Sequence, residues 1–382
     1  MLGITSRITY LLFAILYGSS VALGGELTPQ LVFEKYKNMF DSLKEFHNHD
    51  DNFDQGEWLK HYGDGAAHGP LFDLIEYDRL GDEFHLERAM EALEWNFDFL
   101  NNVMHVPLYS PVRHIQKLET ASMALLSLVK SGAFLQGESR DRFRKQADRL
   151  LWYLDSAAWW LGYYFDAPVG EFAISTYGAT SVTSFVGVIH LEYVLLFPEV
   201  NRDYHLRLAE RYLNGINLKS WDADLSAYRL KPGDPKLYLY PNASMMLFYG
   251  TFYKVTGKAE YLDRYLALYK GIKRLKAPSG DHYYSPYSAE EMGSKTDDYS
   301  TLSSQNYLMI ALIYGYEITG DINFIKEVSH IMGFLEEKLF NGRLLTHHWL
   351  NGGPAKENEL YYYCLGCNMQ TLYILVYLEG LV

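Results

Sequence analysis

Two adjacent carboxylates, Asp297 and Asp298, stand directly before a long apolar segment in "DDYSTLSSQNYLMIALIYGYEITGD". If this segment is a helix, the free backbone amides and the helix dipole at its start stabilise an ionised carboxylate. An ionised carboxylate can act as a base or as a nucleophile. We therefore predict that Asp297 or Asp298 does such work, and the alternative is that either residue only caps the helix.

A carboxylic acid that donates a proton would complete this chemistry, and Glu171 is the first candidate. It lies in the apolar-flanked stretch "PVGEFAISTYG". Apolar surroundings raise the pKa of a carboxyl group, which keeps its proton available for donation. Asp64 and Glu119 are the next candidates, and a plain surface carboxylate is the alternative for Glu171.

Basic side chains offer two further kinds of chemistry. Arg113 and His114 in "SPVRHIQKLET" could clamp a carboxylate of a ligand, because a guanidinium fork matches that group in a bidentate manner. An ordinary ion pair with Glu119 explains Arg113 equally well. Histidine can also remove a proton beside a carbonyl and return it on the other face, which is epimerisation. The candidates for that role are His68, His282, His347 and His348.

The chain has two cysteines, Cys364 and Cys367, in "YYYCLGCNMQ". Three interpretations stay open for this pair. An oxidising compartment favours a disulfide. A zinc site would use both thiolates with His347 or His348. Two free thiols are the third interpretation, and no other cofactor is expected.

Composition limits the classes of protein. A chain of 382 residues with 48% hydrophobic content can bury a large core. The net charge of −13, with Lys and Arg scattered along the chain, argues against nucleic acid as a partner. The 33 tyrosines supply flat apolar faces with a polar tip, which suits a cleft for a sugar, and core packing is the alternative for any one of them.

The first 24 residues have the features of a secretory signal. Arg7 precedes an apolar run from Ile8 to about Tyr17, and Ala22 and Gly24 are the small residues of a cleavage site. The run is shorter than the ~20 apolar residues of a membrane span, and an uncleaved anchor is the alternative. We expect residues 1–24 to be removed and residues 25–382 to be secreted or periplasmic, with no membrane contact after cleavage.

A helical period recurs along the rest of the chain, and strand alternation is almost absent. Three stretches repeat one pattern, in which a helix ends at Tyr-x-x-(Leu/Thr)-Gly and the next helix follows within a few residues. Their glycines are Gly81, Gly257 and Gly320, and weaker copies occur near Gly132 and Pro198. The spacing of about 60 residues predicts an array of helical hairpins.

Six hairpins account for the whole array. The second helices of the hairpins are predicted at 67–80, 116–131, 179–197, 242–256, 303–319 and 361–379, and those that start at 116 and beyond are more apolar. Helices with one charged face are predicted at 30–48, 83–101, 139–155, 201–217, 258–275 and 321–339. Because helices that are apolar all round are buried, the first set forms an inner ring and the second covers it. This arrangement is a single-domain, all-α (α/α)6 toroid.

The pattern resembles the six-hairpin glycosidase superfamily, whose relatives include acylglucosamine 2-epimerases and unsaturated uronyl hydrolases. The segment from Asp297 to Asp321 looks like the Asp-Asp-Tyr, long helix, Tyr-Glu-x-Thr-Gly-Asp pattern of these toroids. The resemblance covers nearly all of the chain after the leader, as architecture. It implies a sugar cleft where the long loops before the inner helices converge, and it leaves the reaction open because one fold hosts several.

On these grounds we expect an exported carbohydrate-active enzyme. A glycoside hydrolase with a carboxylate base or nucleophile opposite a carboxylic acid donor is the first expectation. A sugar epimerase or polysaccharide lyase is the alternative, and a non-catalytic toroid that binds a glycan or a protein belongs to another class. The side chains expected to contact the carbohydrate are Arg113, His114, Trp159, Trp160, Tyr177, Tyr240, Asn242, His282, Tyr299, His347 and His348.

Overall fold

The structure of the protein is a computed structural model. It describes residues 64–104, 122–156, 179–229, 236–284, 287–288, 299–342, 344–350, 353–354 and 365–381. Of these residues, 77% are helical. The predicted leader at 1–24 and the predicted helix at 30–48 lie outside the described residues. Within the described part, no helix is both long enough and apolar enough to span a membrane.

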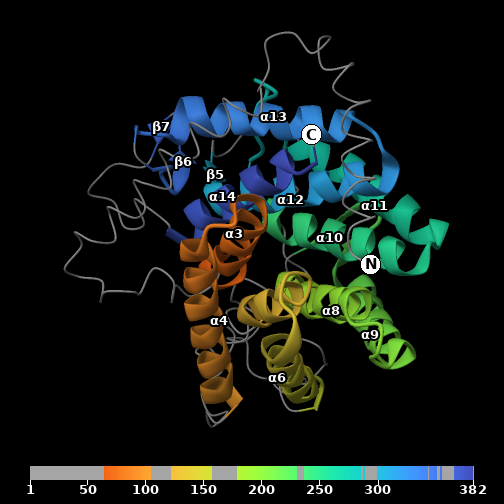
Figure 1. The fold of residues 1–382 in the computed structure, drawn as a ribbon. Coiled ribbons are helices and arrows are strands. Elements are labelled where there is room, and N and C mark those ends of the chain that lie inside the picture. The colour runs from red at the N-terminus through yellow and green to blue at the C-terminus, as the bar shows by residue number, and fades with distance from the viewer. Residues whose placement is uncertain are drawn as a thin grey trace.

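The inner ring consists of helices whose side chains are mostly buried. They are α3 (Asp64–Leu80), a helix at 122–131, α8 (Ala179–Leu196), α10 (Leu239–Thr256), α12 (Leu302–Thr319) and α14 (Leu365–Glu379). Helix α10 lies between α8 and α12, and α14 packs against both α12 and α3 (Figure 1). The first and the last described inner helices are therefore neighbours, which is how a toroid closes.

The outer layer consists of helices with one charged face. They are α4 (Glu83–Met104), α6 (Gly137–Ser156), α9 (Arg202–Ser220), α11 (Ala259–Ile272) and α13 (Asn323–Phe334). Helices α4, α9, α11 and α13 pack against α3, α8, α10 and α12 respectively. Two short helical turns, η3 (Lys273–Leu275) and η4 (Leu335–Leu339), extend α11 and α13. The predicted (α/α)6 toroid is confirmed.

Three hairpin turns share one geometry. The residues Gly81, Gly257 and Gly320 have φ values of 68°, 68° and 70°, in the left-handed region where a side chain is costly. Their N–H groups donate to the carbonyl oxygens of Tyr77, Tyr253 and Tyr316, at 2.8, 2.8 and 2.7 Å. This is the helix-ending motif that the Tyr-x-x-x-Gly repeats predict.

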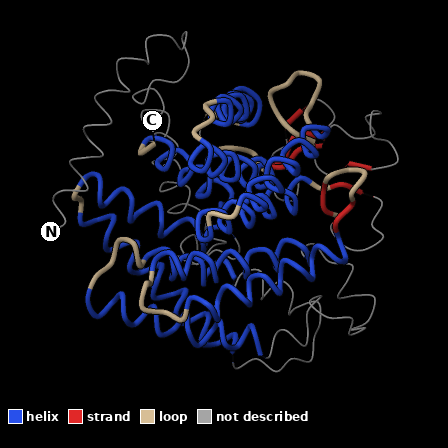
Figure 2. Tube along the Cα trace, turned by 90° about the vertical axis from the view of Figure 1, so that its right-hand side faces the viewer, coloured by secondary structure: helices blue, strands red, loops and turns tan. Residues whose placement is uncertain are grey.

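The loops before the inner helices carry short antiparallel strands that the sequence did not predict. In the loop before α10, β1 (Trp221–Asp222) pairs with β2 (Ala227–Tyr228). Strand β3 (Lys236–Leu237) pairs with β4 (Tyr287–Ser288), which joins the loops before α10 and α12. The described strands gather on one side of the molecule (Figure 2).

A second pairing joins the loops before α12 and α14. Strand β5 (Tyr299–Thr301) pairs with β6 (His348–Leu350), which in turn pairs with β7 (Gly353–Pro354). The register places Ser300 opposite Trp349 and Thr301 opposite His348. Loops of successive hairpins are therefore hydrogen-bonded to one another at the end of the ring where the inner helices begin. We call that end the mouth.

The inner helices α8 and α10 pack closely and run in the same direction. Ser184 and Ser244, each the sixth residue of its helix, share a hydrogen bond of 3.0 Å between their Oγ atoms. One turn further along, a Cβ added at Gly187 would lie 2.1 Å from Cζ of Phe248. Glycine at 187 therefore lets the aromatic ring of α10 lie directly on the backbone of α8.

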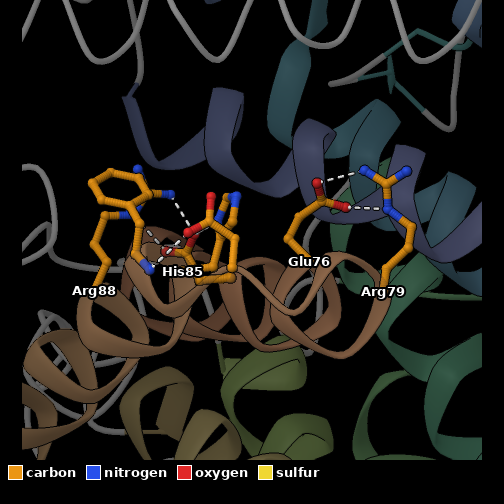
Figure 3. Close-up of polar contacts among 7 residues, drawn as sticks. Glu76, Arg79, His85 and Arg88 are labelled. Carbon is orange, nitrogen blue, oxygen red and sulfur yellow. Dashed lines mark hydrogen bonds and ion pairs between the residues drawn. The ribbon is translucent and has the colours of Figure 1, made fainter.

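A buried carboxylate joins α3 to α4. Asp73 has no exposed surface, and it accepts hydrogen bonds from Arg88 at 2.7 and 2.5 Å. Nδ1 of His85 lies 2.7 Å from the same carboxylate. Figure 3 shows His85 and Arg88 together on one side and the Glu76–Arg79 pair of α3 on the other. A buried charge is tolerated only with such partners, so this cluster fixes the first described hairpin.

A second polar network lies inside the ring, in the C-terminal halves of the inner helices. The Tyr314 hydroxyl donates to Glu192 at 2.5 Å and accepts from Nζ of Lys130 at 3.1 Å. Nζ of Lys254 lies 3.8 Å from the centre of the Tyr314 ring and pairs with Glu317, which also accepts from Tyr377. We call these residues the ring network.

The ring network shifts the ionisation of its members. Burial alone would lower the pKa of Lys130, but Glu192, Tyr373 and Glu317 together raise it above its ordinary value. Burial raises the pKa of Tyr314, and the charge of Glu192 raises it further. Lys130 is thus held positive and Tyr314 is held neutral as a donor. The network links α8, α10, α12, α14 and the helix at 122–131.

The close approach at Gly187 predicts a contrast between two glycines in helices. Gly187→Ala should lower the free energy of unfolding by about 1–3 kcal/mol, because the new methyl group overlaps the Phe248 ring. Gly215→Ala in α9 should be neutral or raise it by up to ~1 kcal/mol, because nothing lies within 4 Å of an added Cβ there. Denaturant melts measure both. Equal effects of the two substitutions would contradict the close packing of α8 on α10.

The ring network predicts a strong effect of removing one charge. Lys130→Met should lower the free energy of unfolding by about 3 kcal/mol, because it leaves Glu192, whose side chain is 7% exposed, without its cation. The double substitution Lys130→Met with Glu192→Gln should recover much of that loss. Denaturant melts of the single and double variants test this. A double variant that loses the sum of the single losses would show that the two side chains act independently.

Candidate functional site

Side chains from all the described inner helices meet inside the ring, within the first nine residues of each helix. They are His68 of α3, Met123, Phe185 of α8, Tyr240 of α10, Tyr307 of α12 and Tyr373 of α14. We call them the floor cluster. All are buried except Tyr240, which is half-buried.

Tyr307 is the centre of the floor cluster. Its ring centroid lies 4.6 Å from that of Tyr240, in a perpendicular arrangement, and 5.2 Å from that of Phe185. Its hydroxyl lies 3.4 Å from Sδ of Met123. Because Tyr307 contacts residues on helices that do not neighbour α12, its side chain points to the centre of the ring.

Besides its tyrosines, the floor cluster contains one titratable side chain, that of His68. Its ring centroid lies 5.0 Å from that of Tyr373 and 6.3 Å from that of Tyr307, and the side chain is 4% exposed. Pro70 and the small residue Gly69 follow it, and Gly69 lies against Met369 of α14. The close approach of α3 and α14 thus brings the imidazole to the phenol rings.

Helix α12 starts close to its predicted position, but its capping residue is not one of the predicted carboxylates. The helix begins at Leu302, its N-cap is Thr301, and the Thr301 side chain accepts from the N–H of Ser304. Strand β5 therefore separates Asp298 from the helix. The idea that Asp297 or Asp298 caps α12 is wrong, because a threonine hydroxyl already does so. The dipole of α12 therefore does not explain an ionised state of Asp297 or Asp298, because a helix dipole acts only on groups near the first turn.

Other predicted residues lie at the mouth, close to the starts of α12 and α14. The carbonyl oxygen of His347 accepts from the N–H of Leu302 at 2.8 Å, and its Nδ1 lies 3.9 Å from Sγ of Cys367. Tyr299 and His348 belong to the paired strands β5 and β6. Cys367 is disulfide-bonded. Within the described residues no group of three or more His, Cys, Asp or Glu side chains has metal-binding geometry.

Two predicted substrate contacts, Asn242 and His282, instead contact other parts of the fold. The amide of Asn242 donates to the carbonyl oxygens of Tyr228 at 2.9 Å and Tyr238 at 2.7 Å, and it accepts from the N–H of Tyr228 at 2.7 Å. Asn242 therefore fastens β2 to α10. His282 is stacked on Phe334 of the outer layer, with ring centroids 4.0 Å apart, so it lies away from the floor cluster.

The remaining predicted residues lie outside the described part of the chain, or only their backbone is described. They are Asp64, Arg113, His114, Glu119, Trp159, Trp160, Glu171, Tyr177, Asp297, Asp298, His348 and Cys364. Their roles stay predictions. Sequence reasoning missed the floor cluster, apart from His68 and Tyr240. Its signal is one large side chain, aromatic in most cases, within the first nine residues of each described inner helix.

Known proteins provide a comparison at the level of the fold. The sequence matches no protein-family model and no curated protein. Among solved structures, a glycosyl hydrolase family 88 protein from Bacteroides vulgatus is 10% identical with a TM-score of 0.64, over 93% of this chain and 100% of that chain. A cellobiose 2-epimerase from Spirochaeta thermophila is 12% identical with a TM-score of 0.64, over 92% and 96%.

A third similar structure is a polysaccharide lyase, which is 12% identical with a TM-score of 0.59, over 92% of this chain and 99% of that chain. At these identities the likeness concerns the fold alone. The three proteins carry three different reaction names, and each is matched over nearly its whole length. The chain therefore has an (α/α)6 toroid fold, and these proteins resemble it in that fold.

Proposed function

We propose that this protein is an exported carbohydrate-active enzyme that hydrolyses glycosidic bonds in an oligo- or polysaccharide. The observation that carries the proposal is the floor cluster, because each described inner helix contributes a large side chain to one place beneath the mouth. Aromatic rings offer flat apolar faces with polar tips, which match the apolar and hydroxylated faces of a sugar ring. The half-buried Tyr240 is the member available to such a ligand.

The position of β5 supports a catalytic role for the adjacent carboxylates. Strand β5 starts at Tyr299 and is held by β6, so the chain enters the mouth directly after Asp298. A glycosidase needs a carboxylate there as base or nucleophile, with an acid on the opposite side of the bond. In this proposal Asp297 or Asp298 is that carboxylate and Glu171 is the acid.

The catalytic role predicts that charge matters at these positions and that helix capping does not. Asp297→Asn or Asp298→Asn should lower kcat on a cleaved glycan by at least about 10²-fold and leave the melting temperature unchanged. Thr301→Ala is the matched control. It removes the observed cap of α12, so it should cost ~1 kcal/mol of stability and leave kcat nearly unchanged.

Mass spectrometry of the products identifies the reaction. Hydrolysis adds one water for each bond cleaved, a lyase leaves an unsaturated sugar without added water, and an epimerase leaves the mass unchanged. Full turnover by both Asn variants would remove the catalytic carboxylates from the proposal. The absence of turnover or binding on a broad glycan panel would favour a toroid that binds a protein.

A sugar epimerase is the second candidate, and His68 is the observation that favours it. Epimerisation requires a group that removes a proton beside a carbonyl and returns it on the other face. An imidazole with a pKa near neutrality suits this role. His68 lies in the floor cluster between Tyr307 and Tyr373, beneath the predicted position of a sugar.

Solvent isotope exchange separates the two candidates. In D₂O an epimerase that uses His68 should place deuterium on carbon in its product, and His68→Gln should reduce turnover by about 10²–10⁴-fold. His330→Gln, on the exposed side of α13, is the matched control and should change nothing. Turnover without deuterium on carbon would exclude the epimerase. Deuterium incorporation that survives His68→Gln would exclude His68 as the base.

A further inference from the structure

A cavity of about 290 Å³ lies outside the ring, between the outer helices α9 and α11. Tyr249 of α10 is among its lining residues, and the turn between α10 and α11 contributes Lys258. Tyr249 is the eleventh residue of its helix, whereas the floor cluster lies within the first nine residues of each inner helix. The cavity is therefore separate from the mouth. Its volume is at the lower end of the range for small-molecule sites.

Of the two basic side chains of the cavity, Lys258 has acidic partners and Arg264 contacts an aromatic ring. Nζ of Lys258 lies 3.8 Å from Glu210 and 3.9 Å from Glu260, so it serves both carboxylates. The guanidinium of Arg264 lies 4.4 Å from the centre of the Trp221 ring. Within the described part of the chain it forms no ion pair and no hydrogen bond. A half-buried guanidinium in this state has its donors available for an anion.

A neutral donor lies in the same cavity. Oδ1 of Asn217 accepts from the hydroxyl groups of Tyr249, at 2.9 Å, and Tyr228. These contacts fix the orientation of the amide, and its Nδ2 forms no hydrogen bond with another described residue. The phenol rings that hold the amide are buried, and burial raises the pKa of both, so both stay neutral donors. Asn217 is thus a preorganised donor in the lining of the cavity.

These features together define a ligand class. Arg264 can bind a carboxylate with two parallel hydrogen bonds, which is the geometry that guanidinium groups favour. Asn217 can donate to a hydroxyl or carboxylate oxygen, and Glu210 can accept from hydroxyl groups. We propose that this cavity binds a small hydroxylated carboxylate of the size of one uronic acid, with Arg264 as its anion contact. The site is independent of the activity proposed for the mouth.

Calorimetric titration of the intact protein with glucuronate tests the site, and glucose and acetate serve as comparison ligands. Glucuronate should bind at least tenfold more tightly than glucose, which lacks the carboxylate, and than acetate, which lacks the hydroxyl groups. Arg264→Gln should weaken glucuronate binding at least tenfold, and Arg264→Lys should weaken it less. Glu260→Gln should tighten binding severalfold, because it removes a repelling charge and frees Lys258.

Arg207→Gln is the matched control, because Arg207 is an exposed arginine of α9 that does not line the cavity. It should leave binding unchanged, and melting temperatures show whether each variant is folded. Turnover at the mouth should be the same in Arg264→Gln as in the parent protein. Glucuronate binding that survives Arg264→Gln would overturn the proposal, because the ligand would then lie elsewhere. Equal binding of glucose and glucuronate, or no binding of glucuronate in the millimolar range, would overturn it too.

Discussion

Tyr314 lies among the buried charged side chains of the ring network. The spacing of the inner helices depends on the pairing of these charges. The Tyr314 hydroxyl bridges Lys130 and Glu192, and the Tyr314 ring lies beneath the ammonium group of Lys254. A buried charge without a partner costs several kcal/mol, so these groups tolerate little change in their positions. Helices that moved apart would break several contacts at once. The ring network thus makes one radius of the ring much more favourable than others.

The direction of the inner helices separates this network from the proposed chemistry. Lys254 stands in the last turn of α10 and Lys130 near the end of its helix, where the negative end of the helix dipole stabilises a cation. The N-terminal ends of the same helices are at the mouth, where the dipole favours anions. The charges that hold the ring together therefore lie at the ends of the inner helices opposite to the mouth.

The fold was predictable because its signal is local and repeated. A glycine such as Gly257 or Gly320 must adopt a left-handed conformation to end its helix, so each hairpin turn is marked in the sequence. The candidate site was less predictable. The start of α12 was expected at 303, close to the observed Leu302, but Thr301 and not Asp298 caps it, because the strand pairing of β5 with β6 involves residues almost 50 positions apart. No local pattern reveals such a pairing.

The floor cluster was also hard to predict from the sequence. An aromatic residue in an apolar helix, such as Phe185 or Tyr307, has the sequence signal of ordinary core packing, and only the closure of the ring brings the two rings together. The described loops before α10, α12 and α14 differ from this floor, because only two or three strand residues join each to the next. A few substitutions there can move a carboxylate while the ring network keeps the helices in place. Solved proteins with three different reaction names resemble this chain in fold, which agrees with the general rule that function on a shared scaffold is set by its loops.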